Sequence, residues 1–572
     1  MMGDTIYIGG ETLNYTHLPP SEKKRRICSP ENLLIFLILF GLLVYRTPDD
    51  FFQPYLWAED GSILIQGAIY NGISGLFVPG NGTYWVIQKL VALLCYWLVL
   101  PTNSIAALPY LMQIFSKILG TLSVMYFISD RFQWLVPKKI YRFGICAAII
   151  LLMPQHSYDV LTCETSLPFE LFFAAFLIGL DLLCSGKYEM PSWGQAFFLA
   201  VLSLSTASAL CIAAIVVAAF FQWIFVQIQT KILVKSRLGI ELVKLGIILA
   251  AVAVQLRLVF FSGRVNDQLD IANRLILNTK SFMFFPYWNE YHSWTAFVIG
   301  LGLWSLIWYM TKLPWKVVFY CGGFSYLFML YCSMTSAAEM FYQGEMTGRY
   351  IFTCFEISAL LIGLAAVKLI DSTRRSNKYV GCVILGIIAI VSLRTYNVPI
   401  IGDEFPEIYE RNCGVYTKGG EDEVRIPIGP FRPWCVTIPA SISGEVLVND
   451  LEFGVEYLDG IVVGSENFGQ LRKDCVGNEH ELIGWARTSV ENQTFERLFI
   501  KNGSTYTAAH EITERAMFYE DAWTHNGFIF FILEDYFNEG ATTIELVGET
   551  ADGTWHYGAI DIATSFNQEA IT

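Results

Sequence analysis

Charged residues are scarce in this 572-residue chain, and this excludes an ordinary soluble protein. Asp, Glu, Lys and Arg make up 16% of the residues, 54% are hydrophobic, and the mean hydropathy is +0.44. A soluble domain carries about 25% charged residues. Several apolar runs reach the roughly 18 to 20 residues that cross a hydrocarbon core. The composition therefore predicts an α-helical protein that crosses the lipid bilayer many times.

The chain also lacks the motifs of nucleotide-binding and zinc enzymes. No glycine-rich phosphate loop follows a predicted strand, there is no HExxH sequence, and the seven histidines are dispersed. The 13 cysteines include no CxxC pair, and many lie in apolar runs, as small buried residues do. One disulfide among Cys413, Cys435 and Cys475 stays open. The net charge of −14 argues against nucleic acid as a partner.

Charge is distributed unevenly along the chain. Residues 1–30 are polar and end in the basic run KKRR shortly before the first apolar stretch, which predicts a cytoplasmic N-terminal tail. Residues 401–572 contain about 30 acidic and about 10 basic groups, and the preceding part is mildly basic. The acidic end is therefore predicted to be a separate soluble domain.

Apolar stretches recur between residues 31 and 395, and the loops between them are alternately basic. The positive-inside rule assigns the basic loops to the cytoplasm; they are residues 138–142, 231–237, 312–316 and 374–378. The loops on the outer side are then 47–83, 154–166, 264–293 and 334–349, together with everything after about 395. The pattern predicts a multi-pass protein of the plasma membrane.

The number of crossings has one inconsistency. Twelve candidate segments that start from the cytoplasm would return the end of the chain to the cytoplasm. One segment is therefore expected not to cross fully, and residues 84–100 are the candidate, as a re-entrant or shallow segment. We expect about 11 to 13 transmembrane helices in a domain that covers residues 31–395.

Beyond residue 396 the pattern changes to short β-rich runs. Examples are GEVLVNDLEF and GFIFFILEDYF, and Gly, Asn and Asp separate such runs. This spacing is typical of an all-β sandwich or jelly roll. Residues 396–572 are thus expected to form an extracytoplasmic, acidic, β-rich domain.

Two adjacent carboxylates, Glu59 and Asp60, lie in the first outer loop, in the run PYLWAEDGSILIQGAIYNGISGLFVPGNGT. A carboxylate at this place can deprotonate a sugar hydroxyl, hold a divalent metal or orient an acceptor. The alternative is an ordinary loop in which the acidic pair stabilises the N-terminus of a helix.

Three basic residues are candidates for binding a phosphate. Arg349, with Tyr350 beside it, stands at the outer entrance of a predicted span, where its planar fork suits phosphate; a snorkelling interfacial arginine is the alternative. Lys89 and, with weaker support, Lys117 lie inside apolar runs, where an ionisable group is costly and by default a functional candidate.

The outer loop 154–166 supplies three further polar candidates. His156, Asp159 and Glu164 can contact a sugar, although polar residues are also common in loops that bind nothing.

The run WAEDGSILIQGAIYNGISGLFVPGNGTYWVIQKLVALL resembles the first outer loop of GT-C-type membrane glycosyltransferases, in particular bacterial ones with a WAEDG-like motif. The resemblance covers residues 50–100 well and continues to about residue 395 only in the order of loops and spans; the β-rich domain is outside it. It implies a polyprenyl-phosphate-linked sugar as donor and an extracytoplasmic polysaccharide or glycolipid as acceptor.

Carried over by position, the resemblance implies that Asp60 is the catalytic base, with Glu59 as its alternative. Arg349 and Tyr350 match the region that binds the donor phosphate, and Lys89 falls where such enzymes often have arginine. Gln88 departs from their preceding proline, and the loop 154–166 departs most, which leaves the role of Glu164 open. No obligatory cofactor is implied, and a divalent metal stays open. A transporter or flippase of lipid-linked saccharides is the rival hypothesis, which the intramembrane lysines favour and the lack of an internal repeat disfavours.

Overall fold

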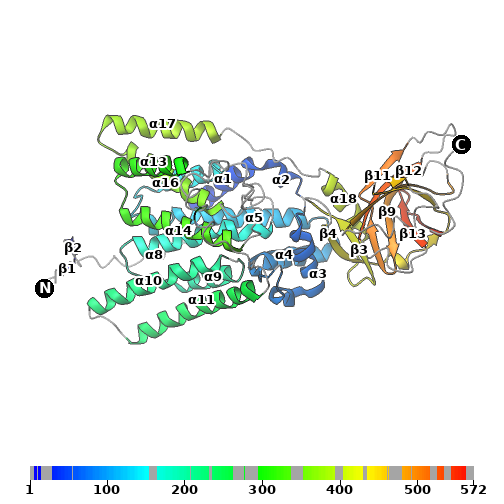
Figure 1. The fold of residues 1–572 in the computed structure, drawn as a ribbon, viewed down its shortest axis with the longest axis horizontal. Coiled ribbons are helices and arrows are strands. Elements are labelled where there is room, and N and C mark those ends of the chain that lie inside the picture. Colours follow the sequence, from blue (N-terminus) through cyan, green and yellow to red (C-terminus); the bar gives the residue numbers. More distant parts are fainter. Residues whose placement is uncertain are drawn as a thin grey trace.

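A computed structural model gives a mostly helical region followed by an all-β region (Figure 1). It describes residues 6–8, 11–13, 29–54, 56–80, 82–153, 164–206, 208–230, 235–261, 276, 294–335, 352–392, 404–429, 434–459, 461–462, 479–490, 493–515, 525–533 and 543–561. Near the N-terminus two short strands, β1 (Ile6–Ile8) and β2 (Glu11–Leu13), pair antiparallel.

The helical region is built from apolar helices whose ends carry recognisable signals. In the first helix, the Ser29 side chain accepts a hydrogen bond from the Asn32 amide, and Pro30 occupies the first turn. The longer helices are α1 (Pro30–Arg46), α4 (Val86–Val99), α5 (Leu108–Met125), α6 (Lys139–Leu151), α8 (Leu167–Cys184), α9 (Trp193–Ser203), α10 (Ala209–Gln229), α11 (Lys235–Phe261), α13 (Trp294–Thr311), α14 (Trp315–Thr335), α16 (Phe352–Ile370) and α17 (Arg375–Ser392).

Five helical segments in the described part are long and apolar enough to cross a membrane. They are Leu108–Phe132, Leu167–Cys184, Ala209–Gln229, Arg237–Phe261 and Phe352–Ile370. These segments fit the membrane protein that the composition predicts. The larger number of 11 to 13 helices, estimated from span length, stays a prediction.

Helix α4 is short for a membrane crossing. It has 14 residues, and at 1.5 Å per residue its length is about 21 Å, whereas a hydrocarbon core is about 30 Å thick. Incomplete crossing by residues 84–100 stays a prediction.

Helix α8 lies at the centre of the helical region. Nearly all its side chains are buried, and apart from Glu170 and Asp181 they are apolar on every face, as a buried helix requires. Phe172 and Phe176 pack on the rings of α14, and the Tyr320 hydroxyl donates to the Phe176 carbonyl oxygen at 2.9 Å. Gly179 allows this approach, because a Cβ there would collide with the Tyr320 hydroxyl.

Ion pairs tie several helix ends together at one end of the helical region. Lys139 lies 3.0 Å from Glu31 at the start of α1, and Lys138 lies 3.6 Å from Asp371, which follows α16. The turn between α16 and α17 is at the end far from the β region (Figure 1). The basic loop 138–142, predicted to be cytoplasmic, is therefore at the opposite end of the molecule from the β region.

The β region is a sandwich of two sheets, which confirms its predicted all-β character. The sheets have the orders β4-β3-β10-β9-β13-β14-β5 and β11-β12-β8-β6-β7. Alternate side chains, such as Leu498 and Ile500 of one sheet and Phe528 and Phe530 of the other, share one core between them. The strands are β3 (Asp422–Pro427), β4 (Cys435–Ala440), β5 (Leu447–Val448), β6 (Glu452–Leu458), β7 (Ile461–Val462), β8 (Glu479–Arg487), β9 (Phe495–Asn502), β10 (Thr505–Ala508), β11 (Glu511–Arg515), β12 (His525–Leu533), β13 (Thr543–Thr550) and β14 (Trp555–Asp561).

The seven-stranded sheet is buried on both faces. Phe499, which lies between Leu498 and Ile500 on β9, points to the other side and belongs to the core that continues into the helical region. Helix α18 (Glu404–Asn412) fills the junction, and its Tyr409 hydroxyl donates to the Ile105 carbonyl oxygen at 2.9 Å. The β region is thus packed onto the helices, at the side where α3 and α4 lie (Figure 1).

Two cysteines considered for a disulfide lie near this junction. Cys413 and Cys435 are not bonded to each other, and Cys475 lies outside the described residues.

A tyrosine pair gives a measurable contribution to the junction. The hydroxyls of Tyr96 on α4 and Tyr416 after α18 lie 2.9 Å apart, and both residues are buried. Changing either tyrosine to phenylalanine should destabilise the protein by about 1–3 kcal/mol, because it leaves the other hydroxyl buried without a partner. Changing both should cost less than the sum. Unfolding of the purified protein in detergent measures this, with the half-exposed Tyr457→Phe as control; additive losses would contradict the pairing.

Candidate functional site

The segment that carries the two adjacent acids is a chain of three short helices. It consists of the π-helix η1 (Asp60–Ile65), α3 (Gln66–Asn71) and the 3-10 helix η2 (Gly72–Phe77). One side packs on the protein through Leu64 and Ile65, while Ile73 and Phe77 are exposed. π-Helical turns are rare and occur frequently at functional sites.

The structure distinguishes the two acids by their burial. Asp60 is 2% exposed, whereas Glu59 is partly exposed. The Oδ1 atom of Asp60 accepts a hydrogen bond from the backbone amide of Thr165 at 2.8 Å. Thr165 lies just before α8, so the positive end of this helix faces the carboxylate. Asp60 is thus held in one orientation inside the protein.

Neutral polar groups without partners gather beside Asp60. The Nε2 atom of Gln88 donates to the carbonyl oxygens of Thr165 at 3.3 Å and Ser205 at 3.1 Å. Its Oε1 atom and the hydroxyls of Thr165 and Ser166 are buried and have no hydrogen-bond partner among the residues that the structure describes. Such groups are costly unless something pairs with them. Together with Asp60 they form what we call the Asp60 cluster: Asp60, Gln88, Thr165 and Ser166.

Lys89, which the resemblance implies as a phosphate contact, makes hydrogen bonds within the protein. Its ammonium donates to the carbonyl oxygens of Gly75, at 3.2 Å, and of Val78. Lys89 therefore links the end of η2 to α4 by hydrogen bonds. A contact between Lys89 and a donor phosphate stays a prediction.

Two further candidate cations are buried in the helical region. Arg46, the last residue of α1, is 1% exposed and donates to the Met153 carbonyl oxygen. Lys117 of α5, also 1% exposed, donates to the Thr47 hydroxyl at 2.9 Å. Arg46 was not among the residues predicted from the sequence, because an arginine at the end of an apolar run ordinarily marks the membrane surface. The burial of Arg46 is what marks it as a candidate, and only the structure shows that burial.

A buried acidic pair lies next to Lys117. Glu170, in the first turn of α8, fits against α5 only because Gly120 has no Cβ. Glu356 of α16 is also buried, and its Oε2 atom has no hydrogen-bond partner in the described part of the chain. Glu170 interacts electrostatically with both Lys117 and Glu356. These three ionisable groups therefore form a cluster between membrane-type helices.

Four predicted site residues lie outside the described residues: His156, Asp159, Arg349 and Tyr350. Glu164 begins the short 3-10 helix η7 (Glu164–Ser166), next to Thr165 of the Asp60 cluster. The structure thus brings together Asp60 and the turn that follows the loop 154–163.

In the described ranges, no three His, Cys, Asp or Glu side chains are grouped as a metal site would require.

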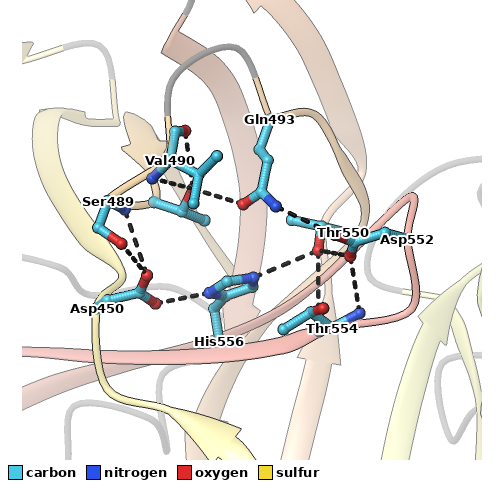
Figure 2. Close-up of polar contacts among 9 residues, drawn as sticks. Asp450, Ser489, Val490, Gln493, Thr550, Asp552, Thr554 and His556 are labelled. Atoms are coloured by element: carbon cyan, nitrogen blue, oxygen red, sulfur yellow. Dashed lines mark hydrogen bonds and ion pairs between the residues drawn. The ribbon is translucent and has the colours of Figure 1, made fainter.

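The β region contains an Asp–His–Thr arrangement of the kind found in hydrolases, shown in Figure 2. His556 lies with Nδ1 2.6 Å from Asp450 and with Nε2 3.3 Å from the Thr550 hydroxyl. However, Thr550 and His556 are buried, and the Thr550 hydroxyl is also 2.7 Å from Asp552. A buried hydroxyl in such a network is not placed to attack a substrate, so we interpret the network as structural.

Comparisons of the chain with models of protein families, with curated proteins and with solved structures find no match. The functional hypothesis therefore depends on the Asp60 cluster and on the resemblance of residues 50–100.

The Asp450 network predicts acid sensitivity of the β region. Burial alone would raise the pKa of Asp450, but hydrogen bonds from Ser489 and His556 outweigh burial and lower it beneath its ordinary value of 3.8. The ionised group thus stabilises the fold above its unfolded pKa, and this contribution is lost as the pH falls through the lower folded value. At neutral pH, Asp450→Asn should cost about 1–3 kcal/mol, and the loss of stability below about pH 4 should be smaller in the variant.

Urea unfolding of the purified protein at several pH values measures this effect. Glu452→Gln is the matched control, because this exposed carboxylate pairs with Arg487 on the surface, where ion pairs contribute little. Parallel pH curves for the wild type and Asp450→Asn would contradict the assignment.

Proposed function

We propose that the protein is a membrane glycosyltransferase that moves a sugar from a polyprenyl-phosphate donor to an extracytoplasmic acceptor, such as a surface polysaccharide or a glycolipid. One observation carries the proposal: a buried, oriented carboxylate, Asp60, lies beside buried hydroxyl and amide groups that have no partner in the described residues. Sugars present the alternating donors and acceptors that such groups bind. The resemblance of residues 50–100 to a GT-C outer loop supports the same reading.

The proposed chemistry uses Asp60 as a general base. The Asp60 carboxylate, which the Thr165 amide orients through Oδ1, takes the proton from an acceptor hydroxyl. The resulting oxygen attacks the anomeric carbon, and the bond to the lipid phosphate breaks on the opposite face, with inversion. The leaving group is an anion whose charge needs compensation rather than a proton. Gln88, Thr165 and Ser166 would orient the sugar.

Cations are required to bind the donor phosphate and to compensate its charge. Arg349 and Tyr350 are the residues that the resemblance implies, with Lys89 as an additional contact. Arg46 at the end of α1 and Lys117 in the middle of α5 add buried positive charge, and α5 packs against η7. A divalent metal would serve the same purpose, by compensating the charge of the departing phosphate.

Asp60→Asn tests the catalytic role directly. Asparagine still accepts the Thr165 hydrogen bond, so the fold should persist while the base is lost. Transfer from a polyprenyl-phosphate sugar in membranes should fall about 10²- to 10⁴-fold. Glu59→Gln, on the adjacent and more exposed acid, should keep most of the activity. Wild-type turnover in Asp60→Asn at normal protein level would contradict the assignment, and loss in Glu59→Gln alone would move it to Glu59.

Arg349→Ala tests the donor site. Loss of a phosphate contact should raise KM for the donor by about 10-fold or more, with little change in KM for the acceptor, because a hydrogen bond to a charged group contributes about 1.5–3 kcal/mol. Initial rates with each substrate varied separately measure this. An equal loss for both substrates would show that the arginine has a structural role.

A transporter of lipid-linked saccharides is the second candidate. The cluster of Lys117, Glu170 and Glu356 favours it, because ionisable groups between membrane helices often mark transport paths. Reconstituted vesicles distinguish the two functions: movement of a lipid-linked sugar between leaflets without transfer supports transport, and transfer without movement supports the enzyme.

A further inference from the structure

We infer that the β3–β4 end of the β region is a positioning element for the catalytic acid, so that the β region is part of the active-site apparatus. This inference rests on the proposed role of Asp60. The element consists of Ile428 and Gly429, which follow β3, and Val436 of β4; we call it the β brace.

The first contact of the β brace is made by the backbone. Trp57 forms a parallel bridge with Gly429, and the Ala58 amide donates to the Gly429 carbonyl oxygen at 2.6 Å. Trp57 and Ala58 lie three and two positions before Asp60. The Asp60 amide in turn donates to the Trp57 carbonyl oxygen at 2.6 Å. The hydrogen bonds thus run from Gly429 through residues 57 and 58 to the backbone of the acid.

Ala58 shows that this backbone is constrained. It has a φ of +32°, which is unfavourable for a residue with a side chain. Such conformations persist where surrounding contacts determine them. Here the Ala58 amide is fixed by Gly429, and its carbonyl oxygen accepts from the Ser62 amide at 3.2 Å and the Ser62 hydroxyl at 3.0 Å. One of the groups that hold this strained turn therefore belongs to the β region.

The second contact is made by side chains on the other side of Asp60. A Cβ on Gly61 would lie 2.5 Å from Cδ1 of Ile428 and 3.2 Å from Cβ of Val436. A methyl group at position 61 would therefore require the end of the Ile428 side chain to move and would crowd Val436. Asp60 is thus flanked on both sides by residues that the β region contacts.

The β brace is itself anchored in its sheet. The Ile428 amide donates to the Trp434 carbonyl oxygen at 3.0 Å, next to the antiparallel pairing of β3 and β4. Further along the same segment, Tyr70 of α3 lies near Glu423 of β3: burial, and then this carboxylate, raise the pKa of Tyr70 to about 12. The segment that carries Asp60 therefore touches the β region at several places along its length.

Catalysis is sensitive to such positioning, because a displacement of about 1 Å can cost about 10²-fold in rate. The inference predicts that a small change in the β region alters the chemical step at Asp60 without touching substrate. It also predicts that Gly61 and Ile428 act as a pair.

A double-mutant experiment on the full-length protein tests this pairing. Gly61→Ala should lower kcat for sugar transfer by about 10²-fold, with KM for the donor nearly unchanged. Ile428→Val removes the Cδ1 atom that the new methyl group would meet, so Gly61→Ala/Ile428→Val should recover most of the lost kcat. Gly67→Ala is the matched control: it lies in the same segment, and nothing is within 4 Å of its Cβ position.

Hydrogen–deuterium exchange of the peptide that contains Ala58 gives a second readout that needs no activity. Its amide should lose protection in Gly61→Ala and regain it in the double variant. If the wild type shows no transfer, the proposed function fails, but the exchange data still test the β brace. Loss of kcat that Ile428→Val does not restore, with unchanged protection of Ala58, would overturn the inference. Wild-type kcat in Gly61→Ala would also overturn it.

Discussion

The hydrogen bond between the Asp60 carboxylate and the Thr165 amide is the interaction on which the organisation of the site depends. A buried carboxylate is costly unless hydrogen bonds or charges compensate for the loss of water. Here the start of α8, the most buried of the candidate membrane helices, supplies a donor, and the sequence separation of 105 residues means that the helices must be assembled first. The position of Asp60 is therefore a product of the whole helical bundle and of the β region that holds residues 57 and 58 from the other side.

The coarse architecture could be predicted from the sequence because it depends on local pattern. Apolar runs at membrane length and short alternating runs after residue 396 report their own structure, and the helical and all-β regions follow from them. The short length of α4 is also visible in the sequence, since Pro101 follows its apolar run closely. The pattern predicts less well which helices and strands contact one another.

The site shows this difference residue by residue. Sequence reasoning found the pair Glu59 and Asp60, but nothing in two neighbouring acids says which one turns inward. Arg46 was missed because a buried arginine and a snorkelling one look identical at the end of an apolar run. Lys89 was found, yet its bonds to the backbone of η2 depend on a fold of the intervening loop that no periodicity describes. The β brace joins residues about 370 positions apart, and such contacts leave no local signal in a single sequence.

The burial of the seven-stranded sheet on both faces has a consequence for how this chain can evolve. A binding module on a flexible linker can be exchanged for another without disturbing the enzyme before it. Here the outer face of the sheet is shared with the helical core, and glycine at position 61 matches the side chains at positions 428 and 436. The two regions should therefore diversify together, and a β region taken from a distant relative would fit this helical region only if its residues at the shared surface came with it.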